Sequence, residues 1–159
     1  MRGSSGMGVA GKVAVSVVAA GAVVTAGVVA GVPIARGWAE GRHQQQAAYD
    51  SGAAAKQDRT SVPRWLPDGA TGVSYLMSTT GGDRLIRATL PGGSAPAECR
   101  KGQPEGPVNL SASWFPDEAV ARADLRCGLY NVALIGDQLY GWQDDDVVIA
   151  ARKAGTTAE

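Results

Sequence analysis

The chain is poor in the residues on which most catalytic sites depend. Its 159 residues include one histidine, His43, and two cysteines, Cys99 and Cys127, which stand too far apart for a CxxC redox motif. The sequence has no HExxH, GxSxG or phosphate-loop motif. No catalytic, cofactor-binding or metal-ligating residue is therefore assigned, and an Asp/Glu pair acting as acid and base is the catalytic arrangement left open.

A strong excess of either charge is also missing. Residues 1–61 carry six basic and three acidic side chains, and residues 62–159 carry nine basic and twelve acidic ones. Because the chain has no basic stripe with interleaved aromatic residues, binding to a phosphate backbone has no electrostatic basis, and we expect no nucleic-acid partner. The 11 arginines against 4 lysines, with abundant Ala, Gly and Val, indicate a high-GC bacterial genome.

One long apolar run lies near the N-terminus. Between Lys12 and Arg36 lie 23 uncharged residues. Of these, Val13–Ile34 would extend about 33 Å as an α-helix, which matches the hydrocarbon core of a bilayer. Trp38 follows at the depth where indole rings favour the headgroup boundary. We therefore predict a transmembrane helix over residues 13–34, so that the lipid bilayer is the first expected partner.

A cleaved secretory signal is the alternative interpretation of this run. Val24-Thr25-Ala26 and Val28-Val29-Ala30 both have the small-x-small form that signal peptidase recognises. The apolar core of a signal peptide spans roughly 7 to 15 residues, however, and this run is longer. Its length favours an uncleaved membrane anchor.

Small residues recur along one side of the predicted transmembrane helix. They could let two helix backbones approach closely, so a homodimer through this face is a hypothesis, and the abundance of Ala and Gly in a GC-rich chain is the alternative explanation. The residues of this face are Ala22, Ala26 and Ala30, beside Gly27 and Gly31 in a GxxxG arrangement.

The charges that flank the apolar run do not decide its orientation. Arg2 and Lys12 on one side are balanced by Arg36 and Arg42 on the other. An extracytoplasmic position for the C-terminal part is expected instead from the short N-terminal tail, residues 1–12, and from the two cysteines. Residues 35–61 are small, polar and rich in Gln and Ala, which predicts a solvated stalk that includes His43.

From Val62 onward the pattern is typical of a small domain. Alternating apolar residues predict strands over residues 73–78, 84–90 and 108–115, the last with Leu110, Ala112 and Trp114 on one face. Pro116-Asp117-Glu118 opens one short helix to about residue 125, and strands over 127–135 and 138–142 follow, joined at Gly136-Asp137. We predict an antiparallel α+β domain over residues 62–153 and a disordered tail over 154–159.

Three further features bear on this domain. Cys99 and Cys127 are expected to form a structural disulfide, worth roughly 3 to 4 kcal/mol in the chain-entropy description. Asp144-Asp145-Asp146 could collect a calcium ion but lacks the alternation of a calcium loop, so a solvated cap on the final strand is expected. The large aromatics supply a core or line a ligand groove. They are Trp65, Trp114, Phe115, Tyr130, Tyr140 and Trp142.

The sequence thus predicts a single-pass protein of a bacterial plasma membrane whose extracytoplasmic domain is a non-catalytic binding or structural module of the cell envelope. Its expected partners are the bilayer, a second copy through the membrane helix, and an envelope protein or ligand of unknown kind. No cofactor is assigned. The alternative is a secreted protein released by signal cleavage, either an inhibitor-like domain or a carboxylate-based hydrolase.

Overall fold

The computed structural model describes residues 43–156, which form one antiparallel sheet with short helices packed on it. The predicted α+β class is confirmed for this part of the chain. In chain order the elements are β1 (Gln44–Ser51), α1 (Gly52–Asp58), β2 (Thr71–Ser78), β3 (Arg84–Thr89), the 3-10 turn η1 (Pro91–Gly93), β4 (Arg100–Lys101), α2 (Asp117–Arg122), β5 (Leu125–Cys127), β6 (Tyr130–Ile135), β7 (Gln138–Gln143) and α3 (Asp145–Lys153).

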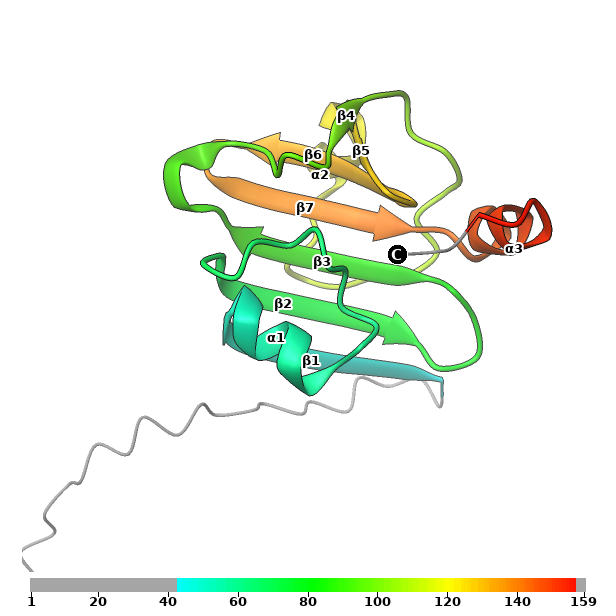
Figure 1. The fold of residues 1–159 in the computed structure, drawn as a ribbon, viewed down its shortest axis with the longest axis horizontal. Coiled ribbons are helices and arrows are strands. Elements are labelled where there is room, and N and C mark those ends of the chain that lie inside the picture. The colour runs from blue at the N-terminus through cyan, green and yellow to red at the C-terminus, as the bar shows by residue number, and fades with distance from the viewer. Residues whose placement is uncertain (1–42, 157–159) are drawn as a thin grey trace, which may run out of the picture. The chain divides into compact units, whose positions relative to one another are not determined.

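The seven strands lie in the order β1-β2-β3-β7-β6-β5-β4 (Figure 1), and every neighbouring pair is antiparallel. The strands predicted near residues 73–78, 84–90 and 138–142 are β2, β3 and β7. The one predicted over 127–135 corresponds to β6, while Cys127 is the last residue of β5. Gly136 in the turn between β6 and β7 has a φ of 64°, a backbone conformation that glycine adopts without a Cβ clash.

Each face of the sheet has its own apolar core. On the face that packs against α1, side chains such as Val73, Tyr75 and Ile86 are fully buried together with Ala55 of the helix. On the opposite face Leu76, Leu85 and Trp142 are covered by the segment that precedes α2. Successive residues of a strand point to opposite faces, and β2, β3 and β7 contribute to both cores.

The predicted stalk over residues 35–61 is wrong for residues 44–58, which form β1 and α1. The segment looks solvated because an edge strand needs only one buried face, and the buried positions here are the small Ala47 and the amphipathic Tyr49. Ser51 ends β1 and caps α1, its hydroxyl oxygen accepting a hydrogen bond from the backbone N–H of Ala54 at 3.1 Å. The folded domain therefore begins well before Val62.

The predicted strand over residues 108–115 is also wrong, because this segment is irregular and pairs with no strand of the sheet. Its alternation is real: Leu110, Ala112 and Trp114 do pack on the sheet, but they come from a segment that crosses the face. An extended backbone has a period of two whether or not it joins a ladder. The expectation of one short helix is likewise wrong, since α1, α2 and α3 are all present.

The predicted disulfide between Cys99 and Cys127 is present. It joins the loop that follows η1 to the end of β5, across a sequence separation of 28 residues. The first residues of the predicted disordered tail differ from expectation: the backbone N–H groups of Gly155 and Thr156 bond to the last carbonyls of α3.

The predicted transmembrane helix over residues 13–34 lies outside the described residues. So do the N-terminal tail over residues 1–12 and the small-residue face, which comprises Ala22, Ala26, Ala30, Gly27 and Gly31. Within residues 43–156 no helix is both long and apolar enough to cross a membrane.

Candidate functional site

One end of the sheet carries a row of side chains on the face that packs against α1. The strand register pairs Gln45 with Met77, Met77 with Arg84, and Arg84 with Gln143. Tyr130, the first residue of β6, continues the row, because the next residue of β6 pairs with the residue before Gln143. The row thus crosses five neighbouring strands, and the segment of residues 59–64 lies against it.

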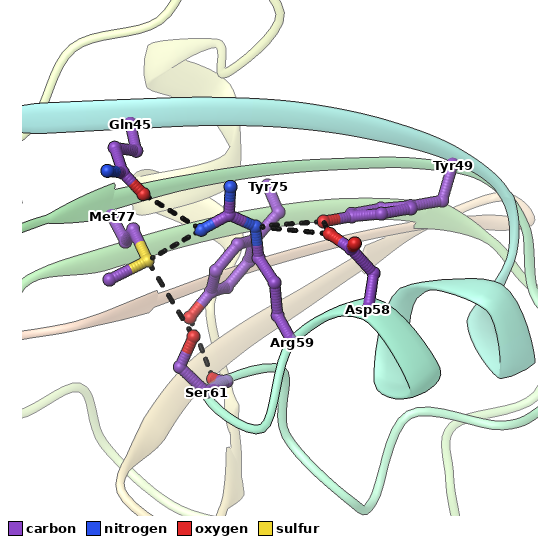
Figure 2. Close-up of polar contacts among 7 residues, drawn as sticks. All are labelled: Gln45, Tyr49, Asp58, Arg59, Ser61, Tyr75 and Met77. Carbon is purple, nitrogen blue, oxygen red and sulfur yellow. Dashed lines mark hydrogen bonds and ion pairs between the residues drawn. The ribbon is translucent and has the colours of Figure 1, made fainter. Parts of the chain in front are cut away.

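Arg59 covers the β1–β2 part of this row, where its Nε and Nη1 both have partners (Figure 2). Its Nε donates to the hydroxyl oxygen of Tyr49 at 2.9 Å, and its Nη1 donates to Gln45 Oε1 at 3.0 Å and contacts the Met77 sulfur at 3.5 Å. Its Nε also lies 3.6 Å from Asp58 Oδ2. The Arg59 network, as we call these contacts, ties the end of α1 to the sheet.

The hydroxyl group of Tyr49 links the two charges of the Arg59 network. It donates to Asp58 Oδ2 at 2.7 Å while it accepts from Arg59. Burial, with the hydrogen bond to Asp58 as a second cause, raises the pKa of Tyr49 to about 12. The phenol therefore stays protonated at every physiological pH and keeps its donor role.

The β3–β7–β6 part of the row lies instead beneath a cavity of about 250 Å³. Three arginines line it, Arg64 from the loop after α1, Arg84 from β3 and Arg152 from α3. We call it the arginine cavity. Figure 1 shows how the fold assembles it: the turn between β2 and β3 and the ends of β7 and α3 meet at the same end of the sheet.

Of the three guanidinium groups, that of Arg84 is held by hydrogen bonds to the protein. Its Nη1 donates to the backbone carbonyls of Ser78 (3.1 Å), Gly81 (2.7 Å) and Asp83 (2.7 Å) in the turn between β2 and β3. Its Nε and Nη2 make no hydrogen bond within the described part of the chain, and neither is among its buried unpartnered nitrogens. Two donor nitrogens of this guanidinium group therefore have no partner among residues 43–156 and are not fully buried.

The carboxylates nearest to the cavity in sequence already have hydrogen-bond partners in the protein. Asp83 Oδ1 accepts from the Asn109 side chain at 2.9 Å and from the backbone N–H of Asp145 at 3.1 Å. Asp144 accepts from Asn109 at 2.8 Å, and Asp145 accepts from the backbone N–H of Gly82. Among the described residues no Asp or Glu lines the cavity.

Tyr130 is almost fully buried and forms the floor of the cavity. Its ring packs edge-on against Trp65, with 5.4 Å between centroids. Burial, together with Tyr75, raises the pKa of Tyr130 well above the usual value for tyrosine, although the charge of Arg84 acts in the opposite direction. The hydroxyl group of Tyr75 donates to the carbonyl oxygen of Ser61 at 2.7 Å.

The histidine and the aspartate cluster considered in the sequence analysis lie outside the arginine cavity. His43 is exposed, as expected for a solvated residue. The expected solvated cap at Asp144–Asp146 is wrong in part, because Asp144 is only 2% exposed and caps α3 by accepting from the backbone N–H of Val147. Within residues 43–156 no group of three or more His, Cys, Asp or Glu side chains is placed to hold a metal ion.

Sequence reasoning missed the arginine cavity altogether. Its three arginines lie 20 and 68 residues apart in sequence, so no local motif joins them, and only the strand register brings Arg84 next to Gln143 and α3. The one signal in the sequence is the excess of arginine over lysine, which a high-GC genome also produces. The chain matches no protein-family model, no curated protein and no solved structure.

Proposed function

We propose that the chain is a single-pass protein of a bacterial plasma membrane that presents this domain on the extracytoplasmic side as a non-catalytic binding module. Its proposed partners are the lipid bilayer, at Val13–Ile34, and a ligand or envelope protein, at the domain. A second copy, packed through the small-residue face of the membrane helix, remains part of the proposal.

The Cys99–Cys127 disulfide is the observation that carries this proposal. It leaves no free cysteine in the described residues, and disulfides of this structural kind persist in oxidising compartments and are rare in the cytosol. Together with an apolar run long enough to span a bilayer, this supports a domain outside the membrane that the run anchors.

The arginine cavity supports binding over hydrolysis. A carboxylate-based hydrolase needs two acids that face one cleft, one to donate a proton and one to act as base or nucleophile. This cavity offers three guanidinium groups and, within the described chain, no carboxylate. Guanidinium groups bind and orient, and they remain protonated at every physiological pH, so they cannot act as general bases there.

Single-cysteine labelling tests the proposed topology. Ser113 is exposed, and we expect Ser113→Cys to react with a membrane-impermeant maleimide in intact cells. Ser4→Cys, in the predicted cytoplasmic tail, should react only after lysis, and the wild-type chain should react in neither case because both of its cysteines are oxidised.

The opposite pattern, with Ser4→Cys labelled in intact cells and Ser113→Cys labelled only after lysis, overturns the topology. A mature protein that begins after Ala26 or Ala30 and is found in the medium replaces the anchor by the secreted alternative. Each outcome is read from the labelled band and from N-terminal sequencing of the same sample.

A further inference from the structure

We propose that the arginine cavity binds the oxyanion of a small organic ligand, a carboxylate or a phosphate group on a compact apolar body. The inference rests on the proposed function in that it takes the domain to be a binding module. It does not depend on the side of the membrane on which the domain lies.

The first support is the concentration of positive charge in one place. Arg64, Arg84 and Arg152 line one cavity, and within the described residues none of them forms an ion pair. Residues 62–159 as a whole carry more acidic than basic side chains, so general basicity of the domain does not explain the cluster. Like charges gathered around one cavity without an ion-pair partner repel one another, and a bound anion would relieve this repulsion.

The second support is the way in which Arg84 is held. Three backbone carbonyls fix its Nη1 and so set the plane of the guanidinium group before a ligand arrives. The other two nitrogens, Nε and Nη2, belong to the same planar fork, whose adjacent donors match the two oxygens of a carboxylate or phosphate. A ligand that binds there loses little affinity to ordering of the side chain.

The third support is the size and lining of the cavity. A volume of about 250 Å³ lies below the range of about 300–1,000 Å³ that holds drug-sized ligands, which points to a small molecule. Val62, Pro63 and Val148 give it apolar walls, and the Tyr130 ring contributes its floor. These surfaces suit the carbon body of an organic acid or phosphate ester more than a free inorganic ion.

Exposed Arg64 and Arg152 define the mouth of the cavity, and half-buried Arg84 its interior. Rim charges steer and select, whereas a fixed interior donor determines how long the ligand stays. The three arginines are therefore expected to contribute unequally to affinity, Arg84 most.

The test is a titration of the full chain, in neutral detergent, with four aromatic probes of similar shape: benzoate, phenyl phosphate, benzamide and benzylamine. Ligand-detected NMR should show that the two anions bind while the neutral amide and the cation do not. Binding should weaken from about 0.01 M to about 0.15 M salt, because the Debye length falls from about 30 to about 8 Å. The stronger of the two anions identifies the oxyanion that the site prefers.

Variants locate the binding. Arg84→Gln should weaken it about tenfold or more, because a charge-assisted hydrogen bond is lost, and Arg64→Gln and Arg152→Gln about threefold each. Arg122→Gln is the matched control, since Arg122 is exposed on α2 and paired with Glu118, and it should bind as the wild-type chain does. Arg152→Gln should also leave the melting temperature unchanged or raise it, as expected of a residue kept for binding.

Equal binding of benzamide and benzoate overturns the proposal, and so does undiminished binding by an Arg64→Gln/Arg152→Gln double variant. This double variant decides the matter even where Arg84→Gln does not fold. If the anions do not bind but Ser113→Cys is labelled from outside, the ligand class alone is wrong. Anion binding by a domain that proves to be cytoplasmic contradicts only the topology.

Discussion

Arg59 and Arg84 lie at the same end of one sheet, yet their guanidinium groups are used in different ways. Arg59 donates from Nε to the hydroxyl oxygen of Tyr49 and from Nη1 to the Gln45 side chain, and its Nη1 also contacts the Met77 sulfur. Arg84 lines a cavity and uses one nitrogen to fix a turn, while its other two nitrogens have no partner in the described part of the chain. A guanidinium group whose donors are engaged stabilises a fold, and one whose donors are held open can bind a ligand.

Ser61 lies where the two regions meet. Its hydroxyl group contacts the Met77 sulfur at 3.7 Å in the Arg59 network, its carbonyl oxygen accepts from Tyr75, and it also lines the arginine cavity. The segment of residues 59–64 therefore serves both regions. The contacts of Arg59 and Ser61 hold the start of the segment on the sheet, and residues 62–64, which follow, form a wall of the cavity.

The largest effect is expected from the cross-link on the cavity side. Cys127 pairs directly with Tyr130 in the β5–β6 register, so the disulfide anchors the strand end that forms the cavity floor. A Cys99→Ala/Cys127→Ala double variant should lose about 3–4 kcal/mol of unfolding free energy in the chain-entropy description. Denaturant unfolding of the wild-type chain and the double variant, with and without reductant, measures this loss.

Reductant should destabilise the wild-type chain and leave the double variant unchanged. A wild-type chain whose midpoint is insensitive to reductant would show that the cross-link does not stabilise this end of the sheet. The floor of the cavity would then be held by the strands alone.

The next largest effect is expected at Arg59. Arg59→Ala removes two hydrogen bonds and the positive charge beside Asp58, and it leaves the half-buried Gln45 and the buried Tyr49 without these partners. We expect a loss of about 2–3 kcal/mol, because hydrogen bonds to charged groups are worth about 1.5–3 kcal/mol each and overlap here. Chemical denaturation gives the value.

Arg64→Ala is the matched control for Arg59→Ala, since Arg64 is exposed and lines the cavity from the same segment. It should change stability by no more than about 0.5 kcal/mol. Equal losses for the two variants would remove the distinction between a structural and an open arginine.

The sequence predicts the fold where one residue pattern decides it. The β2–β3 and β6–β7 hairpins follow from alternating apolar residues around turns, and the Cys99–Cys127 bond follows from two cysteines in a small domain. β1 is missed because its buried face consists of Ala47 and Tyr49 among polar residues, a composition that a solvated stalk shares.

The site is missed for a different reason. Arg84 becomes part of a cavity only because β3 pairs with β7 and the chain then continues into α3, which brings Arg152 to the same place. The two arginines come together because β3 lies next to β7 in the sheet and not next to β4. Local periodicity in the sequence predicts strands but not their order in the sheet. Asp144 is missed in the same way, because its role as a buried cap depends on α3 beginning directly after β7.

The smallest effect is expected on the dependence of stability on alkaline pH, to which Tyr49 of the Arg59 network and Tyr130 of the cavity both contribute. The fold raises the pKa of Tyr49 to about 12, whereas the unfolded value is about 10, so the protonated phenol is the form that the native state favours. Its contribution to stability is complete below pH 10 and is lost as the pH rises through about 12. Burial raises the pKa of Tyr130 as well, so the cavity side also loses stability as the pH rises.

The unfolding free energy measured at about pH 9, 10 and 11 should fall for the wild-type chain, and less steeply for Tyr49→Phe, whose remaining slope belongs to Tyr130 and the other tyrosines. Parallel curves for the two proteins would mean that burial and the hydrogen bond to Asp58 do not keep the Tyr49 hydroxyl protonated, and that the Arg59 network is open to solvent.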